Sequence, residues 1–300
     1  MHSMTQRVSM ALLMACTTAL AHGQELEPRS FNNLPIDQTF VFVGAARSDG
    51  DLSPPGSSPL QDAELTIDGL AVGVSRTFDL AGSSAKADAV ATRLCYEGEG
   101  LFRGEYVEGR RCEYADPRFK LTWNFLGAPA MSMQQFAGWQ QDLVAGVSVS
   151  VNAPWGDYTS RQLINAGSNR WSIKPVLGMS KRYGTRWQWE AKLGATFYED
   201  NDDYYNGAQL QQDPLYSTSF HVIYNLPRGW LSLDANYFTG GRTTVDGQKQ
   251  DTRQDNSRWG VTWSRPLMPR HLLKVYASTG VITRIGNEFN SFGVAWLYRF

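Results

Sequence analysis

The segment 186–197 alternates strictly between apolar and polar side chains over twelve consecutive positions. One face carries Trp187, Trp189, Ala191, Leu193, Ala195 and Phe197, and the other carries Arg186, Gln188, Glu190, Lys192, Gly194 and Thr196. A period of two indicates a β-strand, and strands of soluble proteins are usually only about 5–6 residues long. A tilted strand needs about 9–11 residues to cross a bilayer. The pattern therefore predicts a strand with one face against lipid and the other toward water, as in a membrane β-barrel.

The chain ends on the same kind of pattern. Its last strand places these residues on one apolar and aromatic face: Phe292, Val294, Trp296, Tyr298 and Phe300. An edge strand of a soluble β-sandwich is the alternative, but chain termini of soluble proteins usually fray. The terminal aromatic resembles the C-terminal assembly signal of bacterial outer-membrane proteins. We therefore expect these residues to be recognised by the barrel-assembly machinery.

Alternation of this kind recurs along the chain. We predict an all-β fold, a single antiparallel transmembrane β-barrel of about twelve strands, an even number as in bacterial barrels. The predicted strands are 39–47, 63–78, 86–96, 118–125, 143–152, 170–180, 186–197, 216–225, 231–237, 258–265, 272–282 and 291–300. The longer polar connections alternate with short turns, which predicts extracellular loops and periplasmic turns.

Three local features qualify the strand pattern. The apolar phase of the second strand shifts after Gly69, which predicts a β-bulge there. Pro175 lies within the sixth strand, where it removes a ladder hydrogen bond. The segment 129–141 is the only helix-like passage, and we place this short helix in the periplasm between the fourth and fifth strands.

The N-terminus is typical of an exported protein. Arg7, a short apolar stretch and Ala19-Leu-Ala21 predict a signal peptide over 1–23, with cleavage after Ala21 or slightly later. Leu13-Met-Ala-Cys16 loosely resembles a lipoprotein box, which leaves lipidation as an alternative. Residues 24–38 are polar, and we expect a periplasmic N-terminal lead-in before a barrel that spans 39–300. Removal of the leader leaves Cys95 and Cys112, which an oxidising periplasm favours as a disulfide.

Several function classes lack support in the sequence. The net charge of −1 does not favour nucleic-acid binding, and no mature stretch of 18 apolar residues predicts a membrane-spanning helix. His221 shares a strand face with Ser219, but no paired acid completes a catalytic triad. Cys and His have no metal-ligand spacing, and no glycine-rich phosphate loop precedes a helix. We expect no enzymatic activity, no metal and no cofactor.

The second half of the chain resembles a known bacterial family. The segments that carry this resemblance are Ala153-Pro-Trp-Gly-Asp-Tyr158, Asn165-Ala-Gly-Ser-Asn-Arg-Trp-Ser-Ile-Lys-Pro175, Asn201-Asp-Asp203, Gln212-Asp-Pro-Leu-Tyr-Ser217, Phe238-Thr-Gly-Gly-Arg242 and Asn256-Ser-Arg258. The family is labelled "putative MetA-pathway of phenol degradation" and consists of predicted outer-membrane transporters. The resemblance implies a single barrel with a transport role, aromatic compounds as conjectured cargo, and no catalytic residues.

The face predicted to point into the barrel is rich in cations. The candidate lumen-lining residues are Arg118, Lys120, Arg170, Lys174, Arg186, Glu190, Lys192, His221, Asp234, Arg258 and Lys274. Unbalanced positive charge in a lumen attracts anions and tunes pore selectivity. The function predicted is an outer-membrane channel for passive uptake of small solutes, with aromatic and anionic compounds as candidate classes. The alternatives are a plugged barrel with interior salt bridges, a structural or adhesion barrel, and an outer-membrane hydrolase. The expected partners are outer-membrane lipids, the assembly machinery and a small solute, and the sequence leaves the oligomeric state open.

Overall fold

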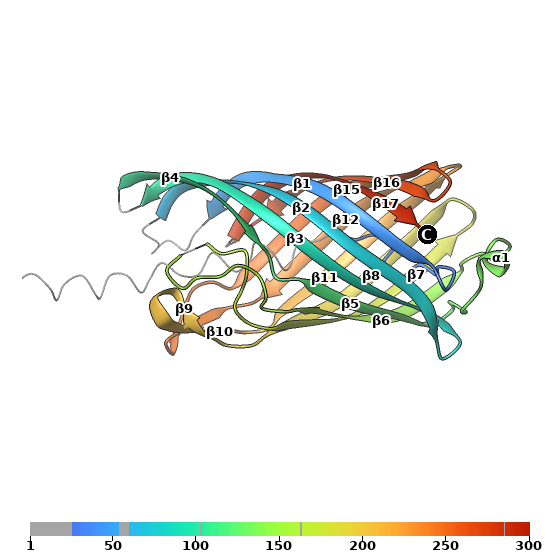
Figure 1. The fold of residues 1–300 in the computed structure, drawn as a ribbon, viewed down its shortest axis with the longest axis horizontal. Coiled ribbons are helices and arrows are strands. Elements are labelled where there is room, and N and C mark those ends of the chain that lie inside the picture. The colour runs from blue at the N-terminus through green and yellow to red at the C-terminus, as the bar shows by residue number, and fades with distance from the viewer. Residues whose placement is uncertain (1–25, 54–59, 103, 163, 285) are drawn as a thin grey trace, which may run out of the picture.

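The computed structural model describes residues 26–53, 60–102, 104–162, 164–284 and 286–300. Within these ranges, twelve antiparallel strands close one β-barrel, whose axis runs horizontally in Figure 1. The order around the wall is β2-β1-β17-β16-β15-β12-β11-β8-β7-β6-β5-β3, and β3 pairs with β2 to complete the ring. The predicted fold class is confirmed. The predicted signal peptide lies outside the described residues.

The barrel strands agree with the predicted ones and most are longer. They are β1 (Thr39–Ser53), β2 (Leu60–Leu80), β3 (Ser83–Phe102), β5 (Arg118–Leu126), β6 (Leu143–Asn152), β7 (Ser172–Tyr183), β8 (Trp187–Tyr198), β11 (Leu215–Leu226), β12 (Gly229–Gly240), β15 (Gln254–Met268), β16 (His271–Ile282) and β17 (Gly286–Arg299). The helix α1 covers only Met133–Phe136 of the predicted 129–141, and Ser132 and Gln135 form a capping box at its start.

The two ends of the barrel differ. Short turns join β2 to β3, β7 to β8, β11 to β12 and β15 to β16, and they lie at the end that carries α1 and the C-terminus (Figure 1). Outer-membrane barrels have short periplasmic turns and longer extracellular loops, so this end is periplasmic. At the extracellular end, β9 (Asn201–Tyr204), β10 (Ala208–Gln212), β13 (Thr243–Val245) and β14 (Gln248–Lys249) form a small four-stranded sheet around a 3₁₀ turn, η1 (Tyr205–Gly207). The sequence predicted loops both for the segment that contains β9 and β10 and for the one that contains β13 and β14.

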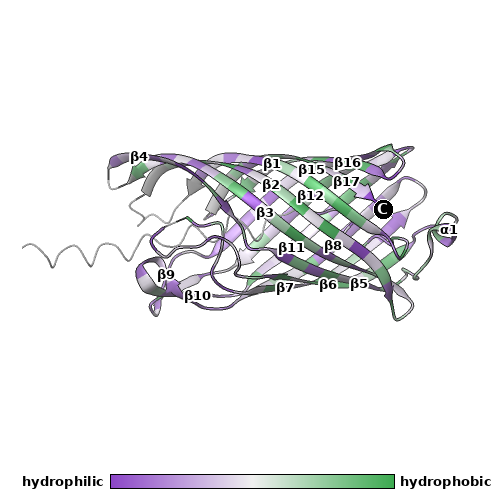
Figure 2. Ribbon diagram, in the orientation of Figure 1, coloured by the Kyte–Doolittle hydropathy of each residue, from purple (hydrophilic) through white to green (hydrophobic). Residues whose placement is uncertain are grey.

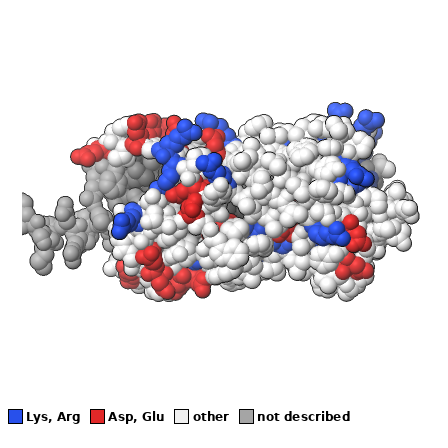
Figure 3. Space-filling view, in the orientation of Figure 1, with Lys and Arg blue, Asp and Glu red and all other residues white. Residues whose placement is uncertain are grey.

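An apolar belt surrounds the outer wall. The outward side chains of Leu193 and Leu233 are 59 % and 60 % exposed, and apolar residues of most other strands are exposed beside them. Figure 2 shows apolar segments on the strands of the wall, and on the face seen in Figure 3 charged atoms gather toward the two ends. Such a belt is stable only against lipid, so the protein is an outer-membrane barrel. In the described part of the chain, no helix is long and apolar enough to span a membrane.

The predicted bulge at Gly69 is wrong. The register of β2 is continuous at Gly69 with both neighbouring strands. The apolar phase shifts because Leu65 and Ile67 are buried in a cluster near the extracellular end, whereas Leu70 is exposed on the outer wall. The chain therefore changes which face is apolar without a change in its pairing. Pro175 fits its strand because its pairing with β8 is interrupted at residues 174 and 175.

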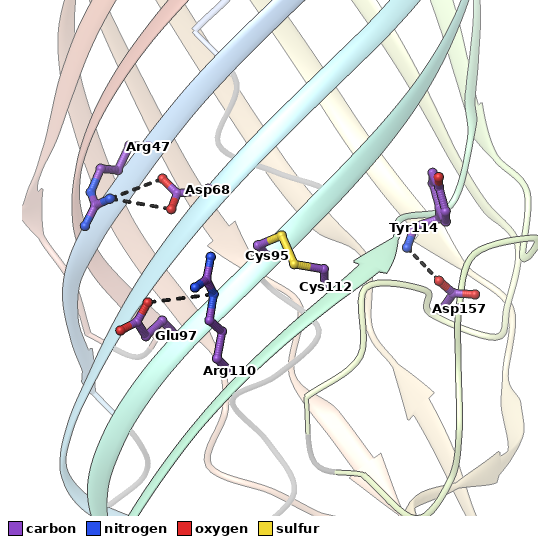
Figure 4. Close-up of a disulfide and its surroundings, with 8 residues drawn as sticks. All are labelled: Arg47, Asp68, Cys95, Glu97, Arg110, Cys112, Tyr114 and Asp157. Carbon is purple, nitrogen blue, oxygen red and sulfur yellow. Dashed lines mark hydrogen bonds and ion pairs between the residues drawn. A yellow bond between two sulfur atoms is a disulfide. The ribbon is translucent and has the colours of Figure 1, made fainter.

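The predicted loop 97–115 is mostly a hairpin. Strand β3 continues to Phe102 and pairs with β4 (Glu105–Tyr114), which stands beyond the β3–β5 pairing. Cys95 and Cys112 lie opposite each other in this hairpin and form a disulfide (Figure 4). Charged pairs flank it, among them Arg47 with Asp68 and Arg110 with Glu97. Most side chains of β4 are exposed and many are charged, so the sequence shows no apolar face that would indicate this strand.

Candidate functional site in the barrel bore

One side of the bore is a polar wall built by β5 to β15. Strand register places Glu190, His221 and Asp234 in one row across β8, β11 and β12. The next row toward the extracellular end contains Lys192, Asn236 and Arg258. All of these side chains are buried although they point into the bore. Something therefore covers this wall.

The cover is the N-terminal segment. Residues 26–36, which we call the plug, run inside the barrel and not in the periplasm as predicted for 24–38. The backbone N–H groups of Ser30 and Phe31 donate to the two carboxylate oxygens of Glu190, each at 3.1 Å. The Glu27 carboxylate pairs with Lys120 Nζ at 2.6 Å, and Lys192 Nζ donates to the Glu27 carbonyl at 2.6 Å. Hydrogen bonds to charged groups contribute about 1.5–3 kcal/mol each, so this contact is strong.

Arg29 and Asn32 extend the contact toward the periplasmic end. Arg29 donates to Asn225 Oδ1 at 2.7 Å and to Gln188 Oε1 at 3.3 Å, and its guanidinium lies 5.4 Å from the centre of the Trp230 ring. Gln188 Nε2 in turn donates to Asn32 Oδ1 at 2.6 Å. The plug thus binds the wall through side chains and backbone.

Glycines on the wall make room for the apolar side chains of the plug. Gly146 and Gly178 are cross-strand partners, and a Cβ on either would collide with the Phe31 ring. On Gly260, a Cβ would lie 2.4 Å from Leu26. Phe31 is fully buried against this surface. The wall is therefore shaped to receive this segment.

The plug leaves the bore at the periplasmic rim, where the segment just before α1 and the end of β2 hold it. Ile36 N donates to the Met131 carbonyl at 2.9 Å, and Thr77 Oγ1 donates to the Pro35 carbonyl at 2.7 Å. The chain then turns at Asp37 into β1.

His221 and Asp234 form a closed polar cluster beneath the plug. His221 Nδ1 lies 2.7 Å from Asp234 Oδ1, and Thr262 and Ser232 donate to Asp234 Oδ2 at 2.7 and 3.1 Å. Within the described chain, His221 Nε2 has no hydrogen-bond partner, and no hydrogen bond joins it to Ser219. An acid and a histidine are thus paired without a nucleophile in contact, so the cluster can orient strands but lacks the arrangement of a triad.

Arg258 and the other predicted lumen residues contact different parts of the barrel. Arg258 donates to Ser278 at 2.8 Å and to the Phe289 carbonyl at 3.1 Å. Arg118, Lys174 and Lys274 lie on the inner faces of β5, β7 and β16. Arg170 precedes β7 at the extracellular rim, where it contacts Gln212 and lies 4.7 Å from the Tyr198 ring centre. Burial lowers the pKa of the Arg170 guanidinium, an effect that the Tyr198 hydroxyl opposes.

The prediction that Arg186 lines the bore is wrong. It lies in the turn between β7 and β8, is exposed, and donates to the Tyr224 hydroxyl at 2.8 Å outside the barrel. The alternation of β8 extends by one residue beyond the strand, so the period alone could not locate its end.

The opposite wall, on β16, β17, β1 and β2, is lined by small and apolar residues. Phe42 lies over Gly73 and Tyr276 over Gly293, so each ring occupies space that a side chain would otherwise fill. Most inner residues of β16, β17 and β1 are partly exposed, with Phe289 and Gly293 of β17 buried, which distinguishes these strands from the covered polar wall. We call this inner surface the open strip; it comprises Phe42, Gly44, Lys274, Tyr276, Ala295 and Leu297.

A loop narrows the extracellular mouth. Ala166 packs with Leu65, Ile67, Tyr96 and Phe289 in an apolar cluster. The Glu113 carboxylate accepts from Ala166 N at 3.0 Å, and that of Asp116 accepts from Ser168 N at 2.8 Å. The loop was predicted as residues 153–169 and covers 153–171 in the structure, but its folding toward the mouth was not predicted.

No group of three or more His, Cys, Asp or Glu side chains suited to a metal occurs among the described residues. The bore presents a plug, a polar wall and an open strip.

Comparison with known proteins agrees with this architecture. The family described as "Putative MetA-pathway of phenol degradation" matches residues 97–297. The COG4313 outer membrane channel from Pseudomonas putida F1 is similar in structure, with a TM-score of 0.79, 19 % identity, and coverage of 92 % of this chain and 100 % of that one. The transport unit of the autotransporter AIDA-I from Escherichia coli has a TM-score of 0.54 and 10 % identity, covering 93 % and 94 % of the two chains. The β domain of the Bordetella autotransporter BrkA has a TM-score of 0.51 and 11 % identity, covering 88 % of this chain and 100 % of that one. No curated protein matches the sequence.

Proposed function

Because the chain belongs to the family described as "Putative MetA-pathway of phenol degradation" and folds as an outer-membrane barrel, we propose that it is a passive channel for small solutes. The observation that carries the proposal is the asymmetry of the bore. The plug covers the polar wall, whereas the open strip on β16, β17 and β1 remains accessible along the inside of the barrel.

The lining of the open strip suggests the kind of solute. Phe42, Tyr276 and Leu297 offer apolar surface, and Lys274 adds one cation. No hydrogen bond or ion pair within the described chain occupies the Lys274 ammonium. Ring faces and a single positive charge favour small aromatic or anionic solutes over sugars and peptides. The pathway named in the family description agrees with an aromatic cargo.

The ion pairs of the plug favour a second candidate, a closed structural barrel. The Glu27 carboxylate pairs with Lys120, and the Glu27 carbonyl accepts from Lys192 Nζ, so the plug compensates cations that would otherwise face a pore. A barrel whose loops bind an outside partner would need no path at all. Single-channel recording separates the two candidates.

Conductance of the purified protein in planar bilayers tests the proposal. We expect small, steady openings for the full chain and larger ones for a variant that lacks residues 24–36, because that deletion uncovers the polar wall. A matched control replaces the same residues with a Gly/Ser linker of equal length. Absence of conductance and of solute flux in all three proteins, each shown to be a folded barrel, would overturn the channel proposal.

A further inference from the structure

The periplasmic mouth contains a cavity of about 710 Å³. It lies between the turn that joins β15 to β16, the turn that joins β11 to β12, and the adjoining ends of β1 and β17. Ligand pockets of proteins commonly have volumes of about 300–1,000 Å³, so the space suits a small organic molecule. We call this cavity the vestibule.

Apolar side chains form the inner part of the vestibule. Phe40, Leu272 and Leu297 come from three neighbouring strands and point into the mouth. Leu297 also belongs to the open strip. Leu272 lies on the same face of β16 as Lys274 and Tyr276, nearer the periplasmic end. The vestibule is therefore the periplasmic end of the open strip.

Three arginines line the same cavity from three different elements: Arg228, Arg270 and Arg299. The lining contains no acidic side chain, and within the described chain no salt bridge joins any of the three to a carboxylate. Arg299 Nη1 donates only to the Met133 sulfur, at 3.7 Å, and a thioether is a weak acceptor. Guanidinium donors thus remain available beside an apolar surface.

This combination defines a ligand class. A guanidinium binds a carboxylate through paired hydrogen bonds, and a ring stacks well on aromatic and aliphatic side chains. We propose that the vestibule binds small aromatic carboxylates, with the ring against Phe40, Leu272 and Leu297 and the carboxylate held by Arg270, Arg299 and Arg228. The site would hold a solute that has followed the open strip before its release into the periplasm. This assignment deepens the proposed channel function and rests on it.

Binding can be measured without flux. Titration calorimetry of the full-length barrel in detergent uses benzoate as the probe, benzyl alcohol as its neutral counterpart and acetate as an anion without a ring. The double variant Arg270→Gln/Arg299→Gln removes two charges and keeps side-chain size. The matched control is Arg265→Gln, an exposed arginine that precedes the same turn and does not line the cavity. A shift in electrophoretic mobility on heating verifies that each variant is a folded barrel.

We expect benzoate to bind more tightly than either counterpart, and the double variant to lose at least about tenfold in affinity, which corresponds to about 1.4 kcal/mol. Arg265→Gln should bind as the wild type does. Equal affinity of the double variant and the wild type, or of acetate and benzoate, would overturn the assignment. Conductance without benzoate binding would reject the vestibule site alone, whereas binding without any conductance would reject the channel and keep the site.

Discussion

The ring of Phe31 occupies the space above Gly178, so that a Cβ on this glycine would lie 2.0 Å from Phe31 Cε2. The plug and the wall are thus complementary at the level of single atoms. Gly146 lies opposite Gly178 on β6 and contributes to the same surface. Glycine weakens a strand interior, and its use here is explained by the close approach of another chain segment.

Substitution of Gly178 should detach the plug from the polar wall of the bore. The variant Gly178→Val places a branched side chain where the Phe31 ring lies, and loss of a buried Phe contact costs about 3–5 kcal/mol. We expect larger single-channel conductance and faster proteolysis within 26–36. Gly138→Ala is the control, because an added Cβ there meets no atom within 4 Å. Unchanged conductance and an unchanged proteolysis rate would show that Phe31 does not hold the plug.

Charge reversal should separate a bore residue from a rim residue. Lys192→Glu places a carboxylate beside Glu190 and Glu27, so ion preference should shift toward cations. Arg186→Glu should leave it nearly unchanged, because Arg186 is exposed in a turn beside Tyr224. Reversal potentials across a salt gradient measure both effects. Equal shifts for the two variants would contradict this placement.

The barrel itself could be predicted because lipid imposes a period of two on every crossing strand. Trp187 to Phe197 and Phe292 to Phe300 show that period without a structure. Leu65 and Ile67 caused the wrong prediction of a bulge at Gly69, because their apolar side chains face inward against the loop at the extracellular mouth. The period of two shows which face of a strand is apolar. An apolar cluster inside the barrel shifts the apolar positions to the other face, as a bulge would.

The plug could not be predicted in the same way. Its contacts join residues about 160 positions apart, such as Ser30 with Glu190, and its irregular backbone carries no period. The signals that pointed to it were indirect. Gly178 faces inward, and the three atoms nearest an added Cβ there all belong to Phe31, so the wall alone does not require glycine at this position. The matching feature in the N-terminal segment was Phe31, an aromatic residue among polar ones.

Loss of the disulfide should affect the extracellular hairpin and spare the barrel. Closing a loop of about 15 residues is worth about 3 kcal/mol, and Cys95 and Cys112 are 17 positions apart. Because β4 pairs with β3 alone among the described strands, we expect Cys95→Ser/Cys112→Ser to speed cleavage within β4 in limited proteolysis. The thermal transition of the barrel should stay within a few degrees of the wild type. A large fall in that transition would show that the hairpin supports the whole wall.

The terminal aromatic should matter to assembly more than to the folded barrel. The Phe300 backbone N–H donates to the Thr39 carbonyl at 2.9 Å, and this bond survives in Phe300→Ala. Phe300 is 64 % exposed, its ring centre lies 4.9 Å from that of Tyr298, and such an aromatic pair is worth about 0.5–1.5 kcal/mol. We therefore expect a strong loss of folded barrel in cell membranes and nearly normal refolding in detergent. Phe220→Ala removes an exposed ring from the outer wall at β11 and should leave assembly intact. If both variants lower refolding and assembly to the same extent, the terminal ring acts through packing and is no assembly signal.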